Sequence, residues 1–167
     1  IRERVDIRIT SSEPLEGVDF QLTFGASISG RVTDATTGLP IAHLELGGGT
    51  MDDGRVSSTD TDGDGYYTLW GLPDGVIDVE TGSQGYIRER VDVRIVDLEP
   101  VEGVDFRLRL GATISGRVTD AATGLPIAEV EMDASSRDQD GPGFYSHAHS
   151  DSDGRFTFLG LAPGAYE

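Results

Sequence analysis

Alternation of apolar and polar residues dominates the sequence. Residues 104–110, VDFRLRL, place an apolar side chain at every second position, and residues 91–95, VDVRI, do the same. A period of two is typical of a strand with one buried face and one solvated face. Further short strands are predicted at residues 29–32, 66–69 and 76–79, separated by turn-forming clusters such as TGLP and GLPDG. No segment has a helical period, so the pattern predicts an all-β chain of antiparallel β-sandwiches with about seven short strands each.

The sequence contains an internal repeat that spans most of its length. The segment that begins IRERVDIRI at Ile1 recurs from Ile87 as IRERVDVRI, a shift of 86 residues. Over that segment roughly 33 of 46 positions are identical. Residues 61–78 match residues 150–167 at a shift of 89, so the second copy carries three extra residues in between. The first shift gives a repeat length of about 86 residues. The three extra residues fall between the two matched segments, where a surface loop tolerates insertion.

The repeat predicts where the domains begin and end. Residues 1–24 correspond to the last two strands of a preceding repeat, residues 25–110 to a complete sandwich, and residues 111–167 to a sandwich that lacks its last strands. An unfinished sandwich leaves an apolar slot and an unpaired strand edge. Because residues 1–24 are the strand pair that this slot lacks, we expect copies to be arranged head to tail. The completing strands come either from the same chain or from another copy.

Composition excludes several classes of protein. The chain has 30 acidic and 13 basic residues, a net charge of −17, and no cysteine, lysine or asparagine. A disulfide scaffold and Lys–Asn cross-links are therefore excluded. The acidic surface repels nucleic-acid phosphates, and no stretch approaches the roughly 20 apolar residues of a membrane helix.

Short motifs recur at the same places in both copies. The first copy has GRV at 30–32, GLPI at 38–41, DGY at 64–66 and GLP at 71–73. The second copy has their counterparts at residues 116–118, 124–127, 153–155 and 160–161. With these motifs the whole chain resembles the carboxypeptidase regulatory-like domain family, a transthyretin-like β-sandwich. The resemblance implies that fold and a non-catalytic role, as an accessory module beside peptidases, in transporters or in surface stalks.

An aspartate-rich loop is the strongest candidate for a metal site. Asp60, Asp62 and Asp64 have the D-x-D-x-D-G spacing with which calcium loops begin. The twelfth position of such a loop would carry a glutamate, and here it is Gly71. The alternative interpretation is a plain Asp-Gly turn between two strands.

The second copy of this loop keeps only part of the pattern. Asp151 and Asp153 remain, whereas His149 stands in place of the first aspartate. Calcium is the one cofactor that these loops suggest, and it would stiffen them by neutralising crowded carboxylates. Further acidic residues lie nearby in the sequence, at Asp52, Asp53, Asp138 and Asp140.

Other candidates for chemistry are weaker. His147 and His149 share one face of an extended segment, a spacing that can bind zinc or copper, but two ligands do not make a site. The third histidine, His43, lies far away in the sequence. The chain has no nucleophile motif such as G-x-S-x-G, so we do not expect an enzyme.

Aromatic residues offer a possible binding surface. Alternation places Tyr67 and Leu69 on one face of their strand, and Tyr66 and Trp70 on the other. The outer pair forms either a platform for a sugar or the packing at a junction between domains, and we favour the junction. The aromatic residues of the second copy are Phe144, Tyr145, Phe156 and Phe158.

These observations predict a non-enzymatic structural protein at the outside of a cell. Tandem sandwiches would form a stalk or filament whose partner is another copy of itself, and the acidic surface would limit lateral clumping. A second hypothesis is a calcium- or polysaccharide-binding module. A third is an accessory domain of a secreted peptidase.

Overall fold

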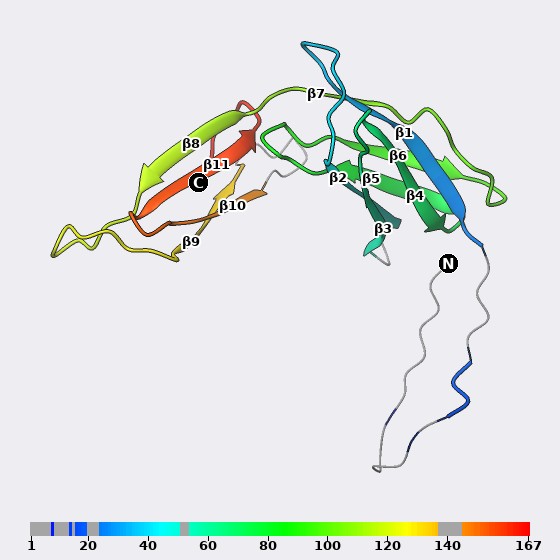
Figure 1. Ribbon diagram of the computed structural model, residues 1–167, viewed down its shortest axis with the longest axis horizontal. Helices are drawn as coiled ribbons and strands as arrows, with labels where there is room; N and C mark the ends of the chain where they lie inside the picture. Colours follow the sequence, from blue (N-terminus) through cyan, green and yellow to red (C-terminus); the bar gives the residue numbers. More distant parts are fainter. Residues whose placement is uncertain (1–7, 9–13, 15, 20–23, 51–53, 137–144) are drawn as a thin grey trace.

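The computed structural model has strands throughout and describes residues 8, 14, 16–19, 24–50, 54–136 and 145–167. Within these residues the chain forms eleven strands and no helix, as the alternating pattern predicts (Figure 1). None of the described segments is a helix that could cross a lipid bilayer. The first repeat contains β1 (Ala26–Asp34), β2 (Glu45–Thr50), β3 (Gly54–Asp60), β4 (Tyr66–Leu72), β5 (Gly75–Thr81), β6 (Arg90–Ile95) and β7 (Phe106–Leu108). The second repeat contains β8 (Ala112–Arg117), β9 (Glu131–Ser135), β10 (Tyr145–His149) and β11 (Arg155–Leu161).

Two sheets make up the first repeat. One has the strand order β4-β1-β7 and the other β3-β2-β5-β6. All pairs are antiparallel except β1 and β7, which run parallel with Val32 opposite Phe106. The chain passes from β6, at the edge of the four-stranded sheet, to β7 at the edge of the other. The segment after Ile87 therefore contributes one strand to each sheet and closes the sandwich.

A continuous apolar core fills the space between these two sheets. Alternate residues of each strand point inward, as in β1, where Ile28 and Val32 are fully buried, and in β5, where Ile77 and Val79 are. The last strand adds Phe106, which is 3% exposed. Fifteen buried apolar residues belong to this core among those that the structure describes. The burial of alternate positions explains why a sequence of only 37% hydrophobic residues folds.

The second repeat has the same local pairing with fewer strands. β8 pairs with β11 and β9 pairs with β10, each antiparallel. Ile114 faces Phe158 in β11, just as Ile28 faces Leu69 in β4. The buried core in the described part of this repeat consists of four residues, Ala134, Ala148, Phe158 and Leu161.

A short loop of the first repeat contacts the second. The backbone N–H of Gly111 donates to the carbonyl oxygen of Gly85 at 2.9 Å, and Tyr86 forms an isolated bridge with Leu110. The loop before β6 and the start of the second repeat are therefore joined through backbone contacts.

Candidate functional site

The edge of β8 that faces away from β11 is the least complete part of the described structure. In the first repeat the corresponding edge of β1 is covered: Ser29 donates its N–H to Val101 at 2.9 Å, and Ala35 donates to Leu108 at 2.8 Å. Among the described residues, β8 has β11 as its one strand neighbour. We call this uncovered side of β8 the open edge. An open edge presents a row of backbone groups that can pair with an added strand.

The inner face of β8 is exposed as well. Ile28 of β1 is fully buried, whereas its counterpart Ile114 is 41% exposed. A position that points outward in both repeats gives the comparison: Leu39 is 65% exposed and its counterpart Leu125 is 64% exposed. The outward position is thus unchanged between the repeats, whereas inward positions of the second repeat are more exposed, as Ile127 at 38% is against Ile41 at 7%. Burying one large apolar side chain completely stabilises a fold by about 1.5–3 kcal/mol, so this face favours a covering strand.

A glycine in β8 keeps space for such a strand. In the first repeat a Cβ built on Gly30 would collide with the carbonyl oxygen of Val104, so glycine is needed there for close approach of the covering segment. The counterpart of Gly30 is Gly116, and a Cβ on it would lie 2.6 Å from the ring of Phe156. The second repeat thus keeps the same small residue at the place where the covering backbone would pass.

The segment with the right sequence to cover β8 lies at the start of the chain. Residues 17–20, GVDF, are identical to residues 103–106 of the covering segment of the first repeat. In that segment Phe106 and Leu108 are buried, and their counterparts are Phe20 and Leu22, which lie outside the described residues. Val18, which is described, is 38% exposed. A segment whose sequence matches the covering strand of the first repeat is therefore present in the chain.

The aspartate loops act as turns in both repeats. One carboxylate oxygen of Asp62 accepts the N–H groups of Asp64 and Tyr66, both at 2.9 Å. Asp151 does the same for Asp153 at 2.9 Å and Arg155 at 2.8 Å. These hydrogen bonds support the Asp-Gly turn that was the alternative to a calcium loop.

The structure does not group the other carboxylates of the calcium prediction into a metal site within the described residues. Asp60 ends β3 and is exposed. No three His, Asp or Glu side chains are grouped to hold a metal ion in the ranges that the structure describes. The nearby Asp52, Asp53, Asp138 and Asp140 lie outside the described residues. Calcium binding at Asp60, Asp62, Asp64, Asp151 and Asp153 stays a prediction.

The histidines face acidic residues across the β9–β10 hairpin. His147 lies 2.6 Å from a carboxylate oxygen of Asp133, and its ring packs edge-on against Tyr145 at 4.1 Å. His149 is paired with Glu131 in the register of the hairpin. Because both positions are exposed, these pairs stabilise the hairpin only slightly.

The side chains of β4 alternate between a buried and an exposed face, as predicted. Tyr67 and Leu69 are 3% and 0% exposed, whereas Tyr66 and Trp70 are 54% and 69% exposed. The guanidinium of Arg31 lies 5.1 Å from the centre of the Tyr66 ring, a cation–π contact. The outer pair does not form the junction between the two repeats of this chain, which is made by the loop around Gly85.

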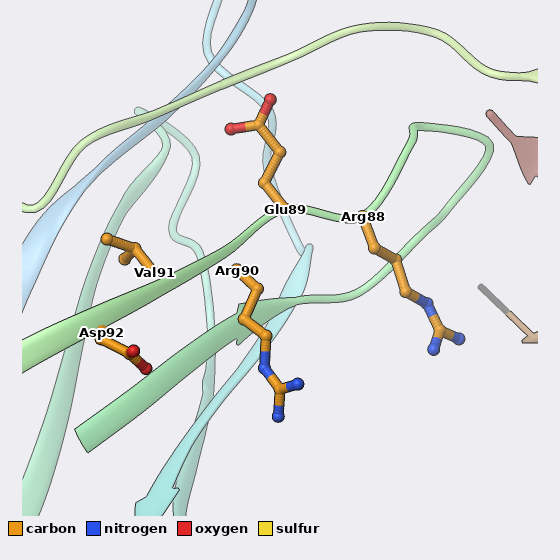
Figure 2. A pocket seen from close by; sticks show the side chains of 5 residues that line it. All are labelled: Arg88, Glu89, Arg90, Val91 and Asp92. Carbon is orange, nitrogen blue, oxygen red and sulfur yellow. The ribbon is translucent and has the colours of Figure 1, made fainter. Parts of the chain in front are cut away.

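A shallow depression of about 460 Å³ lies along β6 and is lined by Arg88, Glu89, Arg90, Val91 and Asp92. Figure 2 shows Arg90 reaching toward the neighbouring strand while Glu89 points to the opposite side. Arg90 forms an ion pair with Asp78, which raises the pKa of its guanidinium, and Arg88 lies 3.7 Å from Glu80. These cross-strand pairs engage both arginines of the depression, which we interpret as part of a solvated face.

Two sets of buried or capping hydroxyls were missed by reading the sequence. The hydroxyl of Thr61 donates to the carbonyl of Ile41 at 2.7 Å and accepts the N–H of Leu44 at 2.9 Å. Ser150 makes the equivalent bonds in the second repeat. Comparison of the copies would have indicated this role, because the two aligned positions both carry a hydroxyl.

Several solved structures are similar to the chain at low sequence identity. A streptococcal ancillary pilin is 16% identical with a TM-score of 0.39, over 84% of this chain and 51% of the pilin. The Bacillus anthracis TIE protein is 16% identical with a TM-score of 0.40, over 86% of this chain and 27% of that protein. The shaft pilin SpaA from Lactobacillus rhamnosus GG is 13% identical with a TM-score of 0.35, over 86% of this chain and 85% of the pilin. The chain thus spans about half the length of the ancillary pilin.

The sequence itself identifies the family. No curated protein sequence matches the chain. The carboxypeptidase regulatory-like domain matches twice, over residues 27–109 and 113–167. These two matches cover most of the chain and coincide with the strands of the two repeats. The chain therefore belongs to the carboxypeptidase regulatory-like domain family.

Proposed function

We propose that this chain is a non-enzymatic structural repeat protein of an extracellular or cell-surface stalk or filament. Its sandwiches are arranged head to tail, and each incomplete sandwich is completed by strands of the neighbouring copy. The observation that carries the proposal is the contrast between Ile28, which is fully buried in the completed sandwich, and Ile114, which is 41% exposed at the same place in the second repeat.

The first repeat shows how the completing strand would be placed. Its β7 pairs in parallel with β1, with Val32 opposite Phe106 and Asp34 opposite Leu108. By the repeat, Phe20 of a neighbouring copy would lie opposite Val118, with Leu22 two residues further on. Addition of a strand to an exposed edge gives affinity through backbone hydrogen bonds and register through the alternate apolar side chains.

Charge supports a linear arrangement rather than a compact aggregate. A net charge of −17 makes copies repel one another wherever no specific contact is made. A head-to-tail contact that does not close into a ring extends without limit, which gives a filament. Each unit then contacts only its neighbours, as in other repeat proteins.

Binding of calcium or of a carbohydrate, as an accessory module of a secreted protein such as a peptidase, is the second candidate function. The exposed side chains of Tyr66 and Trp70 favour a carbohydrate, because sugars stack on flat aromatic rings. The aspartate loop at Asp60, Asp62 and Asp64 favours calcium. Neither feature requires the open edge of β8. A substitution at that edge should therefore abolish assembly and leave the binding of calcium or carbohydrate unchanged.

Sedimentation velocity over a range of protein concentrations, with electron microscopy of the concentrated samples, tests the proposal. We expect the chain to form linear assemblies that lengthen with concentration and fall to single chains in denaturing detergent. Ile114→Asp places a charge on the face to be covered and should abolish assembly. Leu125→Asp lies at an outward position that is more exposed than Ile114, and it should leave assembly unchanged.

Two results would contradict the proposal. The first is a chain that stays monomeric at every concentration. The second is an Ile114→Asp variant that assembles as well as the Leu125→Asp variant, because the open edge would then not be the contact.

A further inference from the structure

The two ends of the first repeat differ in what covers them. At its far end the loop Ser83–Tyr86 contacts the second repeat, where a Cβ on Gly160 would collide with the hydroxyl of Ser83 and lie 2.5 Å from the carbonyl oxygen of Tyr86. Gly160 has a positive φ of 71° and sits in the irregular part of the β8–β11 pairing. A glycine is therefore required both by the backbone and by the loop that packs on it.

The first repeat has the same receiving surface at its other end. Gly71 is the counterpart of Gly160, has a φ of 73°, and lies in the irregular part of the β1–β4 pairing. A Cβ on Gly25 would lie 2.5 Å from the carbonyl carbon of Gly71, and Gly111 approaches Gly160 in the same way. The geometry that accepts the loop in the second repeat is thus present twice.

Two large apolar side chains flank this surface and are exposed. Phe24, which precedes Gly25, is 98% exposed, and Trp70, which precedes Gly71, is 69% exposed. Their counterparts beside the occupied junction, Leu110 and Leu159, are 68% and 49% exposed, so the loop covers this pair only in part. We call the surface formed by Phe24, Gly25, Trp70 and Gly71 the receiving end.

We infer that the receiving end binds the Ser83–Tyr86 loop of another repeat that precedes it in the same polypeptide. This inference rests on the proposed function, because it gives the second contact of a linear array. The linker is already in the chain: residues 87–110 connect the loop to Gly111, and residues 1–24 repeat them directly before Gly25. The loop of a separate copy of this chain is less suitable, since its own second repeat already contacts it.

Distance measurement between spin labels tests the inference, since the chain has no cysteine of its own. Residues 25–86 are duplicated in front of Ile1, so that Tyr86 of the added copy is followed by Ile1 as it is by Ile87 in the chain. Labels are placed through Asp6→Cys and Asp64→Cys across the new junction. The matched pair, Asp92→Cys and Asp153→Cys in the unextended chain, spans the junction that the structure shows.

We expect the two pairs to give the same narrow distance distribution. Ser83→Glu in the added copy should broaden the first distribution, because the larger charged side chain cannot lie against Gly71. The same substitution in the unextended chain should broaden the second.

The outcomes separate this inference from the proposed function. If the added copy folds, seen as a further cooperative unfolding transition, but its distance is broad, the receiving end does not bind the loop and strand completion stands. If the added copy does not fold, residues 1–24 do not complete it, and both proposals are wrong.

Discussion

The hydroxyl of Tyr67 donates a hydrogen bond of 2.7 Å to the carbonyl oxygen of Val104, which ties β4 to the segment that completes the first sandwich. Burial of the phenol raises the pKa of Tyr67, so the group stays protonated and remains a donor at every ordinary pH. The second repeat has Phe156 at this position. Both repeats therefore have an aromatic ring at this position. The hydroxyl that binds Val104 occurs in the repeat that has the covering segment.

Tyr67→Phe tests what this hydrogen bond contributes. Removing the donor takes a hydrogen bond from a partly buried carbonyl, and we expect a loss of about 1 kcal/mol in the free energy of unfolding. Tyr66→Phe, whose ring is 54% exposed, is the control and should be neutral. Urea denaturation measures both, and equal stabilities for the two variants would contradict the role of Tyr67.

Gly30→Ala tests the close approach of the covering segment. Because the added methyl group would collide with the carbonyl oxygen of Val104, the two strands must move apart, and we expect a loss of about 1–3 kcal/mol. Gly63→Ala is the control, since a Cβ there meets nothing within 4 Å. A Gly30→Ala variant as stable as Gly63→Ala would show that the segment is not held tightly.

Much of the fold could be predicted from alternation and repetition. The period of two identifies the inward residues of β1 and β4, and the division of Tyr67 from Tyr66 follows from it directly. The repeat also locates the open edge. In the first copy two strands follow β5, and residues 111–167 do not contain their counterparts. Alternation does not say which strand is the neighbour or in which direction it runs. The parallel pairing of Val32 with Phe106 therefore had to come from the structure.

The candidate site was predicted only in part. A run of aspartates looks the same in a sequence whether its carboxylates bind a cation or accept backbone N–H groups, as Asp62 does. The buried Thr61 was missed because a polar residue between two strands is usually solvated. Exposure cannot be read from the sequence alone: Ile28 and Ile114 lie in nearly identical segments, ASISGRV and ATISGRV, yet one is fully buried and the other is 41% exposed.

Acid should weaken each repeat through an aspartate at a tight turn. One carboxylate oxygen of Asp34 accepts the N–H of Thr37 at 2.7 Å, and these hydrogen bonds hold its pKa below the ordinary value of 3.8. Asp120 and Thr123 form the same arrangement, which lowers the pKa of Asp120. Because the folded state favours the charged form, this stabilisation is present above pH 3.8 and is lost as the pH falls through the lower pKa of the folded state.

Melting temperatures measured from pH 6 downward check this expectation. The difference between the unmodified chain and Asp34→Asn should stay constant at higher pH and shrink once the pH falls below the ordinary value of 3.8. Thr37→Val, which removes the hydroxyl that donates to Asp34 at 3.0 Å, should shift the loss toward higher pH. A difference that stays constant into strong acid would show that Asp34 does not contribute through its charge.

Calcium titration decides between the two interpretations of the aspartate loop. If Asp60, Asp62 and Asp64 share a cation, calcium at 100 times its dissociation constant stabilises the fold by about 2.7 kcal/mol. Calcium should then raise the melting temperature far more than magnesium, which demands a stricter geometry.

Substitutions in the loop identify the source of any calcium effect. Asp60→Asn removes a carboxylate that the turn does not need and should abolish the rise, whereas Asp92→Asn on β6 should keep it. Asp62→Ala should destabilise the chain even without calcium, because it removes the acceptor of two backbone N–H groups. If calcium leaves the melting temperature unchanged while Asp62→Ala still lowers it, the loop is a turn whose carboxylates serve the backbone alone, and the calcium-binding function is wrong.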